Sequence, residues 1–202
     1  MKAPRPFVIG LAMLLAAFDA VAEEPAGYHY RIEPTGSELT WELPATLHTV
    51  HGRAPQISGR LDAVPGEGGD WKVQSRIVVA AAAMESGNES RDRKMREKTL
   101  EVEKFPEIVF EARGVAGDLS KLRPGERATV EVTGDLTVPG KTVSLRVPVD
   151  VQMMAGGAVL SGSFPLAWKQ FGLADPSFGI ITVREPLKVA FRLNAVPEPK
   201  KP

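Results

Sequence analysis

Residues 134–147 read GDLTVPGKTVSLRV, and this stretch decides the class of fold. Its Gly140-Lys141-Thr142 resembles the end of a phosphate-binding loop, in which four residues separate the first glycine from the Gly-Lys pair. Here five residues intervene, 135–139. On both sides of Pro139-Gly140, apolar residues alternate with mostly polar ones, which is the period of a half-buried strand. The stretch therefore predicts a β-hairpin that turns at Pro139-Gly140, and it argues against a nucleotide site.

The same alternation recurs along most of the chain and predicts an all-β fold. We expect strands over residues 28–33, 38–46, 56–64, 71–82, 107–115, 127–138, 141–151, 158–168 and 187–195. Segments rich in glycine or proline, such as Pro34-Thr35-Gly36, separate them as turns. Many short antiparallel strands are typical of a sandwich or of a closed up-and-down barrel. We favour the barrel, because nearly every strand has one large apolar face and closure buries that face without leaving an edge.

One short helix is expected to interrupt the strands, within residues 88–106. Asn88 or Ser90 can cap its start, and Pro106 ends whatever continues that far. Its basic residues are Arg91, Arg93, Lys94, Arg96 and Lys98. They suit a contact with lipid phosphates or a membrane surface, but a solvated helix face held by local ion pairs is the more usual reason for such a composition.

The two ends of the chain differ from the part between them. Lys2 and Arg5 precede an apolar run over residues 7–18, and Ala20-Val21-Ala22 has the pattern of a cleavage site. We therefore expect residues 1–22 to be a secretory signal peptide cut after Ala22, residues 23–196 to form one exported domain, and residues 197–202 to be a disordered, proline-rich tail. The apolar run is shorter than the roughly 20 residues of a membrane-spanning helix.

Composition excludes several classes of function. The chain of 202 residues contains no cysteine, so neither disulfides nor thiol chemistry are expected. Without residues 1–22 it has 23 basic and 24 acidic residues. A protein that binds nucleic acid normally has a clear basic excess, so nucleic acid is not an expected partner.

Few residues suit catalysis or a metal site. His48 and His51 lie three apart at the predicted end of a strand, where they would project to opposite faces unless a turn brings them together. No Gly-x-Ser-x-Gly or His-Glu-x-x-His motif is present. We therefore expect no catalytic residues and no metal. A lipid-modifying enzyme that uses His48 and His51 is kept as an alternative.

The inward-facing residues of the predicted strands are large and apolar. An eight-stranded barrel is just wide enough to be filled by its own side chains or to hold one elongated small ligand. Periodicity leaves both alternatives open.

Three ordered blocks of sequence carry a resemblance to a known family. They are RDRKMREKTLEVEKFPEIVFEA (91–112), VTGDLTVPGKTVSLRVPVDV (132–151) and FPLAWKQFGL (164–173). With SELTWELPATLHTVHG (37–52), they resemble the YceI-like family of bacterial periplasmic lipid-binding proteins. The resemblance covers essentially all of the chain after the predicted signal peptide.

The resemblance implies a lipocalin-like, elongated, eight-stranded antiparallel β-barrel whose tunnel holds an isoprenoid tail. It implies a periplasmic protein that sequesters or carries a polyisoprenoid or an isoprenoid quinone and needs no other cofactor. The ligand-binding residues that we expect are Trp41, Phe110, Leu136, Phe164, Trp168, Phe171 and Phe178. A ligand-free structural or stress-response protein is the alternative, and a homodimer and transient contact with the inner-membrane surface are left open.

The chain departs from the family pattern in two places. Gln170 stands before Phe171-Gly172, where the family often has an acidic residue, and TLHTVHG replaces a more common histidine-rich block. The resemblance therefore does not imply how a head group is recognised. Arg91, Arg93 and His48 are candidates for that contact.

Overall fold

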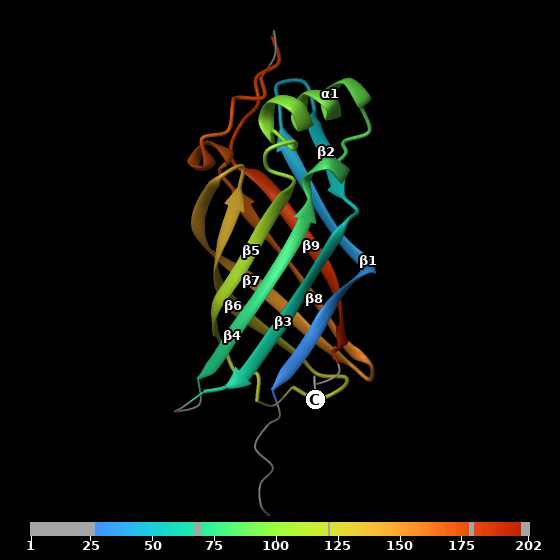
Figure 1. The fold of residues 1–202 in the computed structure, drawn as a ribbon, viewed down its shortest axis with the longest axis vertical. Helices are drawn as coiled ribbons and strands as arrows, with labels where there is room; N and C mark the ends of the chain where they lie inside the picture. Colours follow the sequence, from blue (N-terminus) through green and yellow to red (C-terminus); the bar gives the residue numbers. More distant parts are fainter. Residues whose placement is uncertain (1–26, 67–69, 121, 178–179, 199–202) are drawn as a thin grey trace, which may run out of the picture.

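The computed structural model describes residues 27–66, 70–120, 122–177 and 180–198. They form an elongated barrel (Figure 1). The strands are β1 (Tyr28–Pro44), β2 (Thr49–Ala54), β3 (Ile57–Pro65), β4 (Trp71–Ala80), β5 (Glu107–Ala116), β6 (Arg127–Val138), β7 (Lys141–Met154), β8 (Gly157–Leu166) and β9 (Leu187–Pro197). The predicted signal peptide lies outside the described residues.

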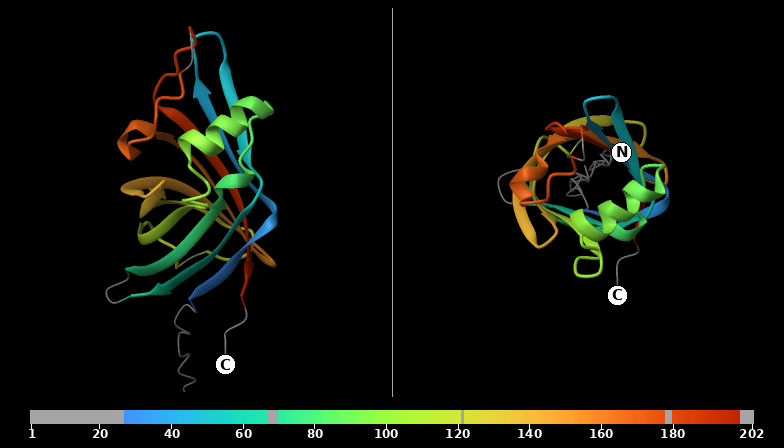
Figure 2. Two further views of the ribbon diagram at one scale, coloured as in Figure 1. Left: turned by 45° about the horizontal axis from the view of Figure 1, so that its top comes forward. Right: turned by 90° about the horizontal axis from the view of Figure 1, so that it is seen from above.

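A single antiparallel sheet closes on itself. The strand order is β2-β1-β3-β4-β5-β6-β7-β8-β9, and β9 also pairs with β1. The first part of β1 pairs with β3, whereas its second part pairs with β2, so β2 and β3 lie end to end along one neighbour. The result is the predicted closed barrel with eight strand positions, seen along its axis in the right panel of Figure 2.

The hairpin predicted at Pro139-Gly140 is confirmed. β6 and β7 pair from Arg127↔Gln152 up to Val138↔Lys141. Gly140 has a φ of 70°. This left-handed conformation favours glycine and lets the chain reverse within two residues.

The turn predicted at Pro34-Thr35-Gly36 is wrong, because β1 runs through it as one strand. The pairing of β1 with β9 shifts register between Glu33 and Glu38, which marks a bulge. Ser37 Oγ donates to the Glu33 carbonyl and accepts from the Asn194 N–H at 2.9 Å. Proline and glycine therefore bend the strand here without ending it.

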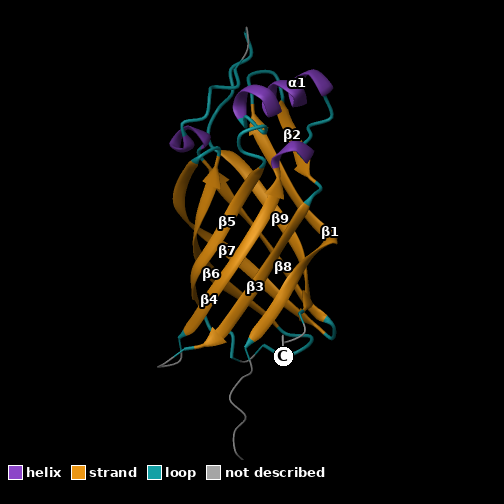
Figure 3. Cartoon of the chain, in the orientation of Figure 1, coloured by secondary structure: helices purple, strands orange, loops and turns teal. Residues whose placement is uncertain are grey.

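The predicted helix is confirmed and lies at one end of the barrel, beside the tip of β1 and β2 (Figure 3). It comprises α1 (Glu89–Lys94) and a π-helical turn, η3 (Met95–Thr99). The Asn88 side chain caps it by accepting from the Arg91 N–H at 3.0 Å. Within the described ranges, no helix is long and apolar enough to cross a bilayer.

The last strand continues further than expected. Pro197 pairs with Tyr30, and the Glu198 N–H donates to the His29 carbonyl at 2.9 Å. The structure thus places Pro197 at the end of β9 and joins Glu198 to β1 by a backbone hydrogen bond. The rest of the predicted tail, residues 199–202, lies outside the described residues.

Candidate functional site

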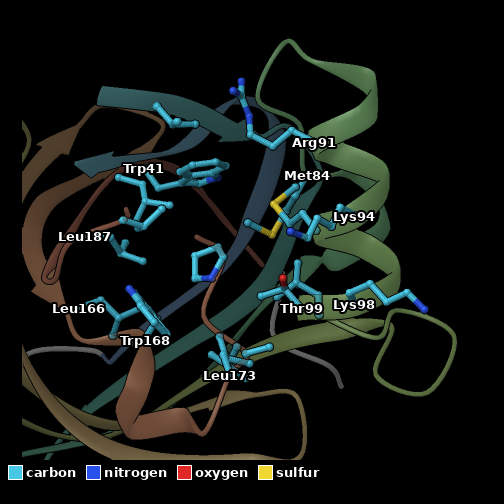
Figure 4. A pocket seen from close by; sticks show the side chains of 18 of the residues that line it. Trp41, Met84, Arg91, Lys94, Lys98, Thr99, Leu166, Trp168, Leu173 and Leu187 are labelled. Carbon is cyan, nitrogen blue, oxygen red and sulfur yellow. The ribbon is translucent and has the colours of Figure 1, made fainter. Parts of the chain in front are cut away.

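The barrel holds a large cavity at the end that carries α1, which we call the mouth end. Its volume is about 800 Å³, within the range typical of small-molecule sites. The strands and the 3₁₀ turn η4 (Trp168–Phe171) contribute its apolar wall, and α1 and η3 contribute a polar rim (Figure 4). The rim residues Arg93, Glu97 and Lys98 are exposed, so the cavity reaches the surface.

A second cavity of about 190 Å³ lies deeper in the barrel. The two cavities share the side chains of Leu39, Val79, Ile108, Leu136 and Phe164. The two cavities are therefore adjacent and have one wall in common. Among the described residues, Ser75 is the one polar residue that lines the inner cavity.

The structure places the predicted ligand-binding residues in these two walls. Trp41, Trp168 and Phe171 line the outer cavity, and Phe110 lines the inner one. The other two residues that can be placed, Leu136 and Phe164, belong to the shared wall. Phe178 lies outside the described residues. The structure thus brings these side chains to one lumen, and their contact with a ligand stays a prediction.

The opposite end of the barrel, which we call the closed end, carries a stacked pair of aromatic residues. The Tyr28 ring stacks on Trp71, with 5.5 Å between ring centroids. Its hydroxyl donates to the carbonyl oxygens of Leu119 and Leu122, at 3.1 and 3.2 Å. Burial raises the pKa of the Tyr28 hydroxyl, which therefore stays protonated and able to donate.

The helix at the rim is fixed by a buried carboxylate. Asp92 is only 6% exposed, and its Oδ1 accepts from the Ser86 N–H at 2.9 Å and from the Ser86 hydroxyl. Arg91 donates from Nε to Ser86 Oγ at 2.7 Å and from Nη2 to the Ser86 carbonyl at 2.9 Å. Arg91 therefore holds the insertion in place, which limits the role in head-group binding that the sequence suggested for it.

Other cations on the rim have more freedom. Arg93 and Lys98 line the outer cavity, and no ion pair or hydrogen bond ties either side chain within the described chain. Glu97 is the one acidic residue among the described lining residues. The rim consequently offers mainly hydrogen-bond donors and positive charge.

Two indole N–H groups in the wall of the outer cavity have no acceptor. Trp41 and Trp168 are 8% and 4% exposed, and the Nε1 of each is buried without a hydrogen-bond partner in the described part of the protein. Leaving such a donor unsatisfied costs about 1–3 kcal/mol. Lys169 Nζ lies 5.1 Å from the Trp168 ring centroid and covers that ring on one side.

The histidines do not form a site together. His48 follows the end of β1 and lines the outer cavity. His51 lies on β2, its side chain is 69% exposed, and its Nδ1 is 3.9 Å from Glu42 Oε1. No cluster of three or more histidine, cysteine, aspartate or glutamate residues suited to a metal occurs in the ranges that the structure describes.

Sequence reasoning missed part of the lining. β2 was not predicted, because two of its three inward residues, Gly52 and Ala54, are too small to produce a clear apolar alternation. Met84 and Met95 line the outer cavity from the insertion, where no strand periodicity applies. Ser75 breaks the apolar face of β4, and it could have been found from its position two residues from Val73 and Ile77.

Comparison with known families agrees with this architecture. The YceI-like domain matches residues 30–195. No curated protein matches the chain.

Solved structures share the fold at low sequence identity. BcnA of Burkholderia cenocepacia has a TM-score of 0.66 and 17% identity, over 82% of this chain and 99% of that one. A polyisoprenoid-binding domain from Saccharophagus degradans, implicated in plant cell wall breakdown, has a TM-score of 0.69 and 19% identity, over 84% and 98%. The YCEI protein of Campylobacter jejuni has a TM-score of 0.61 and 16% identity, over 76% and 88%. At these identities the likeness establishes the fold alone.

Proposed function

Because the chain belongs to the YceI-like family, we propose that it is a periplasmic protein that sequesters or carries an isoprenoid lipid, either a polyisoprenoid or an isoprenoid quinone. The solved domain from Saccharophagus degradans is described as polyisoprenoid-binding, which supports this class of ligand. The prenyl tail would lie along the barrel axis. Its head group would stay near the rim formed by α1 and η3.

The observation that carries the proposal is the shape and chemistry of the lumen. An outer cavity with an apolar wall reaches the surface, an almost wholly apolar inner cavity lies next to it, and Tyr28 stacks on Trp71 at the far end of the barrel. Such a lumen suits a long molecule with an apolar tail and one polar end. A structural protein without a ligand would gain stability from filling the same space.

The energetics allow tight binding. Burial of a CH₂-sized group contributes about 0.8 kcal/mol, so one five-carbon isoprene unit contributes roughly 3–4 kcal/mol. Association costs about 4–15 kcal/mol in lost freedom and ordering. A few buried isoprene units therefore suffice, and the polar head adds orientation more than affinity.

The donor-rich rim favours a head group that carries oxygen acceptors. Arg93, Lys98 and His48 lie at the cavity, and the buried N–H groups of Trp41 and Trp168 lack acceptors. A quinone carbonyl or a polyprenyl hydroxyl or phosphate would supply such oxygens. A pure hydrocarbon would offer the rim cations no acceptor.

We further propose that the protein binds its ligand without transforming it. The histidine pair that a lipid-modifying enzyme would use is separated, since His48 lines the cavity and His51 faces solvent. On this proposal, His48→Ala leaves the chemical identity of the bound lipid unchanged. A variant that accumulates a chemically different lipid would favour the enzyme instead.

Transient contact with the inner membrane is part of the proposal, because two exposed apolar side chains lie at the mouth end. Leu47 and Ile180 are 68% and 86% exposed. Their loops are joined by the Thr46 N–H, which donates to the Thr182 carbonyl at 3.0 Å. These tips could enter the head-group layer of a bilayer while the rim cations face its phosphates.

The test is recovery of the ligand from exported protein. We would express the full chain in a Gram-negative host, purify it from the periplasm without detergent, and combine native mass spectrometry with organic extraction. We expect a mature N-terminus at Glu23 and a stoichiometric prenyl lipid. Stripped protein should take up a long-chain isoprenoid quinone from vesicles but not a quinone that lacks the tail.

Two results would contradict the proposal. One is a protein that contains no lipid and takes up neither a polyprenol nor a prenylated quinone from vesicles. The other is equal uptake of tailed and tailless quinone, because the apolar lumen would then not be the binding element.

A further inference from the structure

Large side chains in the lumen lie against glycines on the neighbouring strand. Trp41 on β1 pairs directly with Gly52 on β2, and a Cβ on Gly52 would overlap the Trp41 ring. A Cβ on Gly134 would lie 2.6 Å from Phe110 Cζ. A Cβ on Gly162 would lie 2.8 Å from the Cζ of Phe191 and closer still to the Pro148 carbonyl oxygen.

These glycines determine where the three rings lie. Real Cβ atoms essentially never approach a heavy atom within 3.0 Å, so each ring occupies space that any other residue would fill. The rings consequently rest against the barrel wall and do not extend across the lumen. Trp41 then lines the outer cavity, and Phe110 and Phe191 line the inner one.

A side chain at Gly52, Gly134 or Gly162 would push the neighbouring aromatic ring toward the lumen. Trp41 borders the outer cavity, and Phe110 and Phe191 border the inner one, so free volume lies beside each ring. The inner cavity has about 190 Å³ to lose, whereas the outer cavity has about 800 Å³. The same ring displacement therefore removes a much larger share of the inner cavity.

We propose that Gly134 and Gly162 set the length of prenyl chain that the barrel accepts, and that Gly52 keeps the common entrance wide. This inference rests on the proposed function and adds a specificity determinant to it. A short chain would fit within the outer cavity. A long chain would need the inner cavity, which exists because Phe110 and Phe191 lie on glycine.

The experiment offers stripped protein a set of polyprenols of graded chain length in vesicles and measures bound species by native mass spectrometry. For Gly134→Ala we expect the longest chains to lose at least about tenfold in uptake, since several buried CH₂ groups lose their site. Short chains should bind as in the wild type. For Gly52→Ala, whose three nearest atoms all belong to Trp41, we expect weaker uptake of every length.

Gly114→Ala is the matched control, because no atom lies within 4 Å of a Cβ at that position of β5. It should leave the length profile unchanged. The double variant Gly134→Ala/Phe110→Leu, which trims the displaced ring, should recover long chains. A Cβ on Gly134 would also lie 2.6 Å from the Glu111 carbonyl oxygen. Backbone strain from that contact stays in the double variant, so recovery of long chains would show that the displaced ring causes the loss.

The outcomes distinguish this inference from the proposed function. If the wild type takes up no chain of any length, the proposed function fails and this inference fails with it. If the wild type binds and a folded Gly134→Ala has the same length profile, this inference alone is overturned. The same holds if Gly134→Ala loses long chains and the double variant does not regain them. If Gly134→Ala does not fold, Phe110→Trp narrows the inner cavity from the ring side, and unchanged uptake of long chains by that variant would overturn the inference.

Discussion

The two ends of the barrel use aromatic residues in opposite ways. At the closed end, the rings of Tyr28 and Trp71 stack on each other, and the Tyr28 hydroxyl has two backbone acceptors. At the mouth end, Trp41 lies against Gly52, and neither its N–H nor that of Trp168 has an acceptor in the described chain. Residues of one chemical class thus fill one end and line a hollow at the other. Whether a ring packs against another ring or against a glycine decides whether that end of the barrel is filled or hollow.

The comparison explains why a barrel rich in aromatic and aliphatic side chains is not solid. Tight packing is the usual state of a protein interior. Here three rings lie against glycines of the neighbouring strands, which leaves space on the barrel axis at a cost in packing energy. A ligand that fills this space would recover part of that cost, which is consistent with a protein selected to bind and not only to fold.

The largest expected effect comes from opening the closed end with Trp71→Ala. Removing a buried tryptophan costs about 3–5 kcal/mol of unfolding free energy, and Trp71 is 9% exposed. Urea unfolding would measure this loss. Trp168→Ala serves as the comparison, because its ring borders an existing cavity. An equal loss for the two variants would contradict the distinction between a filled end and a hollow end.

A charge in the shared wall should abolish binding with less damage to the fold. Phe164→Glu places a carboxylate between the two cavities, where the mouth allows it some hydration. We expect prenyl-lipid affinity to fall by at least about 3 kcal/mol, roughly a hundredfold. Uptake from vesicles measures the change, and Met154→Glu, at the exposed end of β7, is the control. Lipid retention in a folded Phe164→Glu variant would show that the tail does not pass this wall.

A smaller effect should distinguish the Tyr28 hydroxyl, which has two acceptors, from the indole N–H groups of Trp41 and Trp168, which have none in the described chain. Tyr28→Phe removes a donor with two acceptors and should cost about 1 kcal/mol of stability. Replacing Trp168 with 3-benzothienylalanine, in which sulfur takes the place of the N–H, should cost the ligand-free protein no stability, because no hydrogen bond is lost. In the presence of a prenylated quinone, the same replacement should weaken binding if the ligand accepts from that N–H. Chemical denaturation without the quinone measures the stability of the ligand-free protein, and denaturation with the quinone measures the change in binding.

The sequence predicted those features that depend on nearby residues. The Pro139-Gly140 hairpin, the alternation of most strands and the Asn88 cap are encoded within a few positions, and the structure confirms them. The closed barrel follows from many such strands, each with one apolar face. Six predicted ligand-binding residues line the lumen. Three of them, Phe110, Leu136 and Phe171, were expected from the family resemblance. Strand alternation gave Trp41 and Phe164 correctly, whereas Trp168, also expected from alternation, lies with Phe171 on η4.

The features that the sequence did not reveal depend on pairing between distant segments. Pro34-Thr35-Gly36 has the composition of a turn, and only the ladder with β9 keeps that segment in a strand. Whether the lumen is filled or hollow depends on which glycine lies opposite which ring. That information is in the register of β1 with β2 and of β8 with β9, and single-chain periodicity does not contain it.

The smallest effect concerns pH at the closed end. Burial raises the pKa of the Tyr28 hydroxyl above its ordinary value, while Arg123 lowers it and Glu126 raises it to lesser extents. The folded protein therefore keeps a proton that the unfolded chain releases at about pH 10, and the stability contribution, complete below that pH, is lost as the pH rises through the folded-state pKa. The difference in unfolding free energy between wild type and Tyr28→Phe should thus shrink between about pH 8 and about pH 11. Burial and, to a lesser extent, the neighbouring Tyr28 raise the pKa of Tyr30, so the difference reports Tyr28 together with its effect on Tyr30. A gap that stays constant over this range would mean that the hydroxyl at the closed end is as well solvated as in the unfolded chain, and the contrast between the two ends would then rest on ring stacking alone.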